Sequence, residues 1–150
     1  MTKHEAPIAI ASLHTANRHD SGPKHVAGSA EYIDDMVEPA GTMHAYLALS
    51  TRAHADIVGI DYAAVKASLG VIGILTADDV PGANDVSPSH KHDEPVFAIG
   101  KVHFWGQPLF AVIAETRDQA RRAAHLVKVE YRDLPHHTNV RAAQAAGGNW

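Results

Sequence analysis

The sequence contains no cysteine among its 150 residues. This absence excludes disulfide bonds, iron–sulfur clusters, thiolate zinc sites and cysteine nucleophiles within the chain. The sequence also lacks an apolar run approaching the roughly 18 residues that indicate a membrane span, and its first residues lack the apolar core of a signal peptide. We therefore expect a cytoplasmic protein with no membrane partner. Any redox centre that it serves must lie in another domain or chain.

Clusters of basic residues are lacking as well. Arg121 and Arg122 are the only adjacent basic pair, and the formal net charge is −4. Binding to nucleic acid requires a clustered basic face, so the sequence predicts no nucleic-acid partner. With 45% hydrophobic and 20% charged residues, the composition is that of an ordinary globular protein. A chain of this length forms one domain with a normal core.

The common catalytic signatures are also missing. The sequence has no Gly-x-Gly-x-x-Gly, no Gly-x-x-x-x-Gly-Lys-Ser/Thr and no Gly-x-Ser-x-Gly motif. Carboxylates are paired at 34–35, 78–79 and 93–94, but neighbours in sequence point apart in a strand and do not face each other on a helix. These pairs therefore do not predict acid/base catalysis. The pair Asp78-Asp79 is better interpreted as the cap of a helical turn.

Hydrophobic periodicity predicts one α+β domain between an arm and a linker. Residues 1–25 mix polar residues with little apolar sequence, which predicts a poorly packed arm. The domain is expected at 26–138, with a first strand at 42–50. Residues 139–150 are expected to form a short helix and then the start of a linker to domains that the chain does not contain.

Two later segments share a strand, helix, strand plan. In the first, strands at 57–60 and 71–75 flank a helix at 61–69, with Gly70 at its left-handed C-terminal position. Asp61 is the expected N-cap. One face of this helix is expected to carry Tyr62, Val65 and Leu69.

The second unit runs from a strand at 109–114 to a strand at 126–131. Thr116-x-x-Gln119 predicts a capping box for a helix that extends to about His125. Alanines are expected to pack closely on the sheet, with charged residues facing water: Ala120, Ala123 and Ala124 on one side, and Arg117, Asp118, Arg121 and Arg122 on the other. Together the two units predict a mixed sheet with two main helices on one side.

A patterned loop separates the two units. Pro81-Gly82 is a turn signal, and the side chains of Asn84-Asp85 can hydrogen-bond their own backbone. Because the flanks are apolar, we expect an ordered loop that faces a partner or a cavity. Farther on, the amide of Gln107 is expected to satisfy loop backbone, or alternatively to contact a group opposite. Phe104 and Trp105 are expected in the core or an interface rather than in a substrate platform.

The chain has 12 histidines, and most of them are isolated. The isolated residues His44, His54, His103 and His125 are expected to be partly buried and bonded to backbone. Only His90, His92 and Asp93 have the density of a metal site. Solvated loop histidines are the simpler interpretation, and a site for a divalent metal in a free-standing binding module is the alternative.

Several motifs in order resemble the molybdenum subunit of the xanthine dehydrogenase and aldehyde oxidase family of molybdenum hydroxylases. The resemblance runs from about Asp20 to Ala145 and is confined to that subunit's N-terminal α/β-hammerhead domain. The motifs are His19-Asp-Ser21, Gly28-Ser-Ala-Glu-Tyr-Ile-Asp-Asp35, Leu49-Ser50, Ala53-His-Ala55, Thr76-Ala-Asp-Asp-Val-Pro-Gly-Ala-Asn84, Asp93-Glu-Pro95, Gly106-Gln-Pro108 and Val129-Glu-Tyr-x-Asp-Leu-Pro135.

This resemblance implies an α/β-hammerhead fold and a part in purine or aldehyde hydroxylation at a molybdopterin centre. In such families the residues at molybdenum lie in later domains, which implies that this chain binds no cofactor and is inactive alone. Its partners would be the remaining molybdopterin-binding domains and the iron–sulfur/FAD subunit, with electrons passing to NAD. The surface that normally packs on these partners would be exposed in the isolated chain, so self-association is possible.

The resemblance also suggests what the long loop does. In the family, the segment between the Pro-Gly-x-Asn turn and the Asp-Glu pair approaches the mouth of the substrate channel. By position, this segment contains Val86, Ser87, Pro88, Ser89, His90, Lys91 and His92. The resemblance thus implies a loop that gates access of the substrate without taking part in catalysis.

Overall fold

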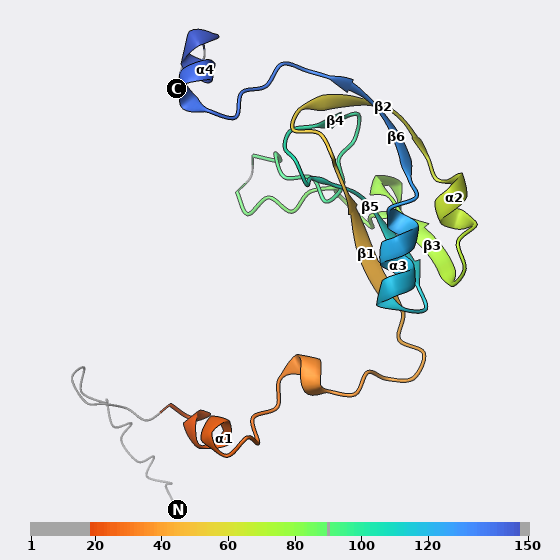
Figure 1. Ribbon diagram of the computed structural model, residues 1–150, viewed down its shortest axis with the longest axis vertical. Coiled ribbons are helices and arrows are strands. Elements are labelled where there is room, and N and C mark those ends of the chain that lie inside the picture. Colours follow the sequence, from red (N-terminus) through yellow and green to blue (C-terminus); the bar gives the residue numbers. More distant parts are fainter. Residues whose placement is uncertain (1–18, 90, 148–150) are drawn as a thin grey trace, which may run out of the picture. The chain divides into compact units, whose positions relative to one another are not determined.

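The computed structural model describes residues 19–89 and 91–147, and Figure 1 shows the order of its helices and strands. The chain divides into two units, Met1–Glu38 and Pro39–Trp150, which are described separately. Of the expected arm at 1–25, residues 1–18 lie outside the described part. None of the described helices is long and apolar enough to cross a membrane.

The first unit contains a short helix, α1 (Gly22–Val26), and a 3-10 turn, η1 (Ile33–Asp35). Neither element buries a side chain. The turn is capped by Asp35, whose carboxylate accepts a hydrogen bond of 2.9 Å from the backbone N–H of Tyr32. The Tyr32 hydroxyl lies 2.9 Å from Nδ1 of His25, which links the two short elements. This unit is therefore held by local polar contacts rather than by an apolar core.

The second unit contains two three-stranded sheets. The first sheet has the order β1-β5-β3, formed by β1 (His44–Leu49), β5 (Pro108–Ala114) and β3 (Val71–Leu75). The second has the order β4-β2-β6, formed by β4 (Lys101–Val102), β2 (Ala55–Asp61) and β6 (Lys128–Asp133). The α+β class is confirmed. The expectation of a mixed sheet was wrong, because every strand pair among the described residues is antiparallel.

The core of the unit lies along the middle strand of the first sheet. Leu109, Phe110, Ala111 and Val112 of β5 are all buried, as expected for a strand covered on both faces. On β1 the inner face carries Tyr46 and Ala48, whereas the apolar face with Leu47 is exposed. Alternation in the sequence therefore located this strand, but the burial of its faces was decided by the tertiary structure.

The main helix, α3 (Arg117–Ala124), packs on β1 and β5. It begins after Thr116, whose side-chain oxygen accepts the backbone N–H of Gln119 at 3.2 Å, as the capping box predicts. The three alanines Ala120, Ala123 and Ala124 are buried, and the four expected charged positions are exposed. Both assignments are confirmed. Small side chains here let the helix lie close to the sheet.

Both strand, helix, strand units exist, but each connects one sheet to the other. The first passes from β2 through α2 (Ala63–Lys66) to β3, and the second passes from β5 through α3 to β6. The helices therefore join different sheets instead of covering one mixed sheet. Figure 1 shows both connections within the second unit. Pairing partners far apart in sequence decided this arrangement, which local periodicity does not report.

The first of these helices is shorter than expected. It ends at Lys66, and Leu69 is 89% exposed rather than packed on the helical face with Val65, so that assignment was wrong. Asp61 is the last residue of β2 rather than the N-cap position, yet its carboxylate accepts the N–H of Ala63 at 2.8 Å. Gly70 has a φ of 79°, which confirms its expected left-handed conformation.

The second sheet is held in register by charge as well as by backbone pairing. Asp56 of β2 lies opposite Lys101 on β4 and Arg132 on β6. Its carboxylate accepts two hydrogen bonds from the Arg132 guanidinium at 2.7 and 3.1 Å, and Lys101 Nζ lies 3.7 Å away. The hydrogen bond from Arg132 lowers the pKa of Asp56. After β6, α4 (Val140–Ala145) forms the expected short helix, capped by Asn139.

Candidate functional site

The candidate site is the long loop between β3 and β4. It begins after a 3-10 turn, η2 (Ala77–Asp79), in which the Asp79 carboxylate accepts the N–H of Thr76 at 2.8 Å and its hydroxyl at 2.9 Å. These hydrogen bonds lower the pKa of Asp79. The predicted cap at Asp78-Asp79 is thereby confirmed, and Asp79 serves the backbone of its own turn.

The two sides of the loop are tied together by Asn84. Its Oδ1 accepts the backbone N–H of Phe97 at 3.0 Å, and its Nδ2 donates to the backbone carbonyl of Phe97 at 2.8 Å. Phe97 is buried, so these two hydrogen bonds fasten the base of the loop to the folded unit. The sequence suggested local bonding for Asn84, and the distant partner was missed because no local pattern indicates it.

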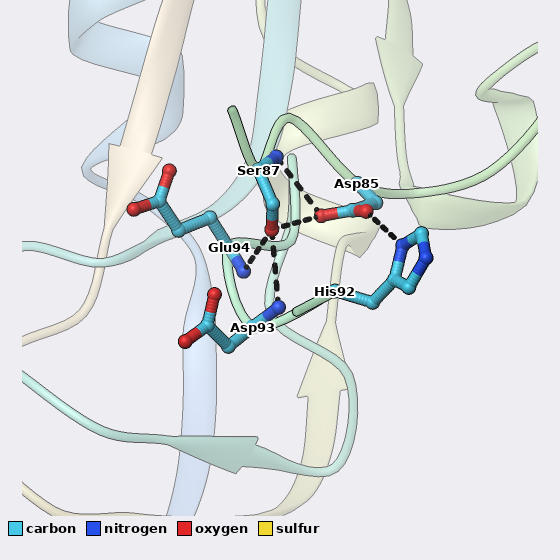
Figure 2. Close-up of polar contacts among 5 residues, drawn as sticks. All are labelled: Asp85, Ser87, His92, Asp93 and Glu94. Atoms are coloured by element: carbon cyan, nitrogen blue, oxygen red, sulfur yellow. Dashed lines mark hydrogen bonds and ion pairs between the residues drawn. The ribbon is translucent and has the colours of Figure 1, made fainter. Parts of the chain in front are cut away.

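Within the loop, polar contacts converge on Asp85 (Figure 2). One carboxylate oxygen accepts the hydroxyl of Ser87 at 2.5 Å and its backbone N–H at 3.0 Å, as expected for a side chain that bonds its own turn. The other lies 2.5 Å from Nδ1 of His92, a contact between residues seven positions apart. The two hydrogen bonds from Ser87, followed by that from His92, lower the pKa of Asp85 from 3.8 to about 2.

Ser87 is the second centre of the loop. Its Oγ accepts the backbone N–H groups of Asp93 and Glu94, both at 3.0 Å, while it donates to Asp85. Glu94 also accepts the N–H of Val86 through its backbone carbonyl at 2.9 Å. The hydroxyl of Ser87 thus forms its hydrogen bonds within the loop, with two backbone N–H groups and with the Asp85 carboxylate. A serine nucleophile instead needs a histidine base within hydrogen-bond reach, so this Ser, Asp, His set is structural.

The hypothesis of a metal site in this loop receives no support from the described residues. His90 lies outside the described part of the chain, and Nδ1 of His92 is turned toward Asp85. Figure 2 shows the Asp93 carboxylate and the His92 ring pointing in opposite directions. Across residues 19–89 and 91–147, no group of three or more His, Asp or Glu side chains is placed to hold a metal ion.

Of the seven expected channel residues, the described ones divide into two groups. Ser87 is half buried and fixed by the contacts above. The exposed members are Val86, Pro88, Ser89, Lys91 and His92. The backbone of His92 has a φ of 54°, a left-handed conformation that is uncommon for a residue with a side chain. The loop therefore presents a mixed apolar and polar outer surface on a hydrogen-bonded frame.

The turn before β5 behaves as its sequence suggested. Gln107 is 2% exposed, and its Oε1 accepts the backbone N–H of His103 at 2.8 Å. The interpretation that its amide satisfies loop backbone is confirmed. Phe104 and Trp105, however, are 54% and 68% exposed, so the expectation that they lie in the core of this chain was wrong. Their place in an interface stays a prediction.

The isolated histidines also include some that are partly buried, as expected, and some that are exposed. His44 and His54 are half buried, as expected, and Nδ1 of His54 lies 2.9 Å from the carbonyl oxygen of Pro135, which confirms its bond to backbone. His103 and His125 are exposed, which corrects the expected burial. The ring of His103 instead stacks on that of His54, with the two centroids 6.0 Å apart. Burial of single histidines therefore did not follow from local sequence.

Comparison with known proteins places this fold in one family. Residues 27–135 match the family described as aldehyde oxidase and xanthine dehydrogenase, a/b hammerhead domain. A xanthine dehydrogenase of Oryza sativa subsp. japonica is 46% identical over 129 residues, covering 86% of this chain and 9% of the relative. Aldehyde oxidase 2 of Mus musculus is 40% identical over 116 residues, covering 77% of this chain and 8% of the relative.

A solved structure agrees with the sequence relatives. The aldehyde oxidoreductase from Desulfovibrio desulfuricans ATCC 27774 superposes with a TM-score of 0.73 at 30% identity, covering 84% of this chain and 15% of that one. The chain thus spans about a tenth of the length of the curated relatives that it matches. Sequence and fold lead to the same conclusion: the chain belongs to the aldehyde oxidase and xanthine dehydrogenase family, as its α/β-hammerhead domain.

Proposed function

We propose that this chain is the hammerhead domain of a xanthine dehydrogenase that hydroxylates purines. The match over residues 27–135 carries the proposal, and the 46% identity to the rice xanthine dehydrogenase supports a purine substrate. Because the chain spans 9% of the rice enzyme, the activity belongs to the whole enzyme. The isolated chain is inactive.

The cofactors of such an enzyme lie outside this chain. Buried polar side-chain atoms among the described residues already have hydrogen-bond partners, and no His, Asp or Glu cluster there suits a metal ion. These residues do not fit a molybdopterin site, and no chemical step is assigned to them. The remaining molybdopterin-binding domains and an iron–sulfur/FAD subunit, which reduces NAD, are the proposed partners. The proposed location is the cytoplasm.

Within that enzyme, the loop tied by Asn84 and Asp85 forms part of the wall of the substrate channel. The supporting observation is that residues of the loop differ in their contacts. Ser87 forms hydrogen bonds within the loop, while Lys91 and His92 are exposed. A loop fixed in this way presents a constant shape to a passing molecule. It contributes to access and binding of the substrate rather than to the reaction.

The test is kinetic and uses the complete enzyme. Removal of Ser87–Lys91 is expected to change KM for xanthine more than kcat, because the loop acts before the chemical step. Lys91→Ala keeps the loop frame, since only the backbone N–H of Lys91 has a described contact, and it is expected to shift KM in the same direction. Lys66→Ala, an exposed lysine at the end of α2, is the matched control.

Two results would contradict the parts of this proposal separately. Unchanged kinetic constants for xanthine in both loop variants would remove the channel role. Turnover of aldehydes but not of xanthine by the unaltered enzyme would remove the purine assignment and leave the family membership intact. The alternative of a metal-binding module predicts stoichiometric zinc or nickel that is lost in His92→Ala.

A further inference from the structure

A groove of about 630 Å³ lies between the two sheets of the second unit. It runs between β1 of the first sheet and β6 of the second, with the C-terminal end of α3 beside it. The residues that line it from the two strands and their continuations are 46–52, 127–129 and 131, together with Trp105, Gly106, Ala124 and His125. The loop between β3 and β4 does not contribute, so this groove is distinct from the candidate channel wall.

The groove is bounded by strand edges rather than by strand faces. Successive side chains of a strand point to opposite faces, so a face would contribute every second residue. Here β1 contributes the unbroken run 46–49, and β6 contributes the neighbours Lys128 and Val129 together with Tyr131. Both β1 and β6 are terminal strands of their sheets in the described part of the chain. Each therefore directs alternate backbone N–H and C=O groups away from its single partner strand.

The charged side chains that line this groove are of one sign. Among the described lining residues they are Arg52 and Lys128, and none is Asp or Glu. The Arg52 guanidinium lies 5.5 Å from the ring centroid of Tyr131 and forms an ion pair of 3.1 Å with Asp133, which lies outside the lining. Lys128 forms no ion pair within the described residues. A carboxylate bound in the groove would therefore lie near the Lys128 ammonium group and could pair with it.

We propose that this groove is a β-strand acceptor. Its occupant is an extended polypeptide segment that carries a carboxylate; this assignment rests on the proposed function, because the segment is supplied by a part of that enzyme outside this chain. The segment adds to the free edge of β1 or β6 through main-chain hydrogen bonds, places apolar side chains against Leu47 or Val129, and pairs its carboxylate with Lys128. This chain spans about a tenth of the length of these relatives, so most of such an enzyme lies outside the part that it matches and is available to supply the segment.

A second copy of the chain fits this groove less well. Two identical grooves facing each other across a twofold axis would bring cationic side chains of both copies together without an acid from either lining. Like charges placed opposite each other across strands are destabilising. The chemistry of the groove therefore favours an acidic segment from elsewhere over self-pairing.

The test uses the 150-residue chain and a displayed library of random twelve-residue peptides. The expected binders alternate apolar and polar residues, carry Asp or Glu, and lack proline in the bound stretch. The best binder, added as a free peptide, is expected to shift the backbone amide resonances of 46–49 and 128–131. Methylation of alternate backbone nitrogens of that peptide is expected to weaken binding at least about tenfold, because strand addition depends on main-chain donors.

Charge reversal provides the matched comparison. Lys128→Glu is expected to weaken binding of the peptide about three- to tenfold, whereas Lys66→Glu makes the same charge change on α2 and is expected to leave binding unaltered. Equal binding by the Lys128→Glu variant, resonance shifts elsewhere, or failure to select any binder would overturn the proposal. Sedimentation that shows a dimer through this groove, which the peptide cannot displace, would assign it to a second copy instead.

Discussion

Removal of the Asn84 side chain is the sharpest test of the loop's frame. The amide makes two hydrogen bonds to the backbone of Phe97, at 2.8 and 3.0 Å, across the base of the loop. A hydrogen bond contributes about 0.5–1.5 kcal/mol net, and a partner left without water costs more. Because Phe97 is buried, Asn84→Ala is expected to lower the free energy of unfolding by about 2–3 kcal/mol.

Asn84→Asp separates the two hydrogen bonds. The new carboxylate keeps the acceptor for the Phe97 N–H but places an oxygen where Nδ2 donates to the Phe97 carbonyl. Repulsion there raises the pKa of the introduced carboxyl in the folded protein, so its stabilising contribution is present at low pH and lost as the pH rises through that value. The deficit relative to the natural sequence is therefore expected to be smaller at about pH 4 than at pH 7.

Urea unfolding followed by circular dichroism measures these differences, and amide hydrogen exchange of residues 85–94 reports the opening of the loop. Asp93→Asn is the matched control, because only the backbone of Asp93 contacts Ser87, and it is expected to stay within about 0.5 kcal/mol. If Asn84→Ala unfolds at the same free energy as the natural sequence and leaves exchange in the loop unchanged, the anchoring role is refuted.

Three further changes test other parts of the fold. Ala123→Leu is expected to cost about 1–3 kcal/mol by overpacking α3 against the sheet, while Arg121→Ala stays within about 0.5 kcal/mol, and urea melts in the reverse order would contradict the facing of the helix. Gly70→Ala is expected to cost about 1–2 kcal/mol, because φ is 79° and the added Cβ meets the Gln119 side chain, as chemical unfolding would measure. The Asp85 carboxyl, with its pKa lowered to about 2, stabilises the fold above about pH 4 and loses this contribution as the pH falls toward 2. The difference in unfolding free energy between the natural sequence and Asp85→Asn is therefore expected to shrink over that range. A constant difference would show that the Ser87 and His92 contacts do not form.

Local signals in the sequence determined the elements of this protein and some of their caps. Thr116-x-x-Gln119 and the alanines after it specified α3 and its buried side, because capping and the helical period act within a few residues. The left-handed conformation of Gly70 and the capped turn at Asp78-Asp79 were also predicted from local sequence. The ordered motifs also indicated the family, since they follow one another along the chain in a specific sequence.

The tertiary structure alone decided what joins distant parts of the chain. Pairing of β1 with β5 and of β2 with β6 divided the expected mixed sheet into two, because strand pairing is chosen by long-range packing and register rather than by local pattern. The same reason explains the Asn84 contact with Phe97 and the groove between β1 and β6. Sequence thus determined which segments fold locally, and only the fold decided which of their edges and side chains meet.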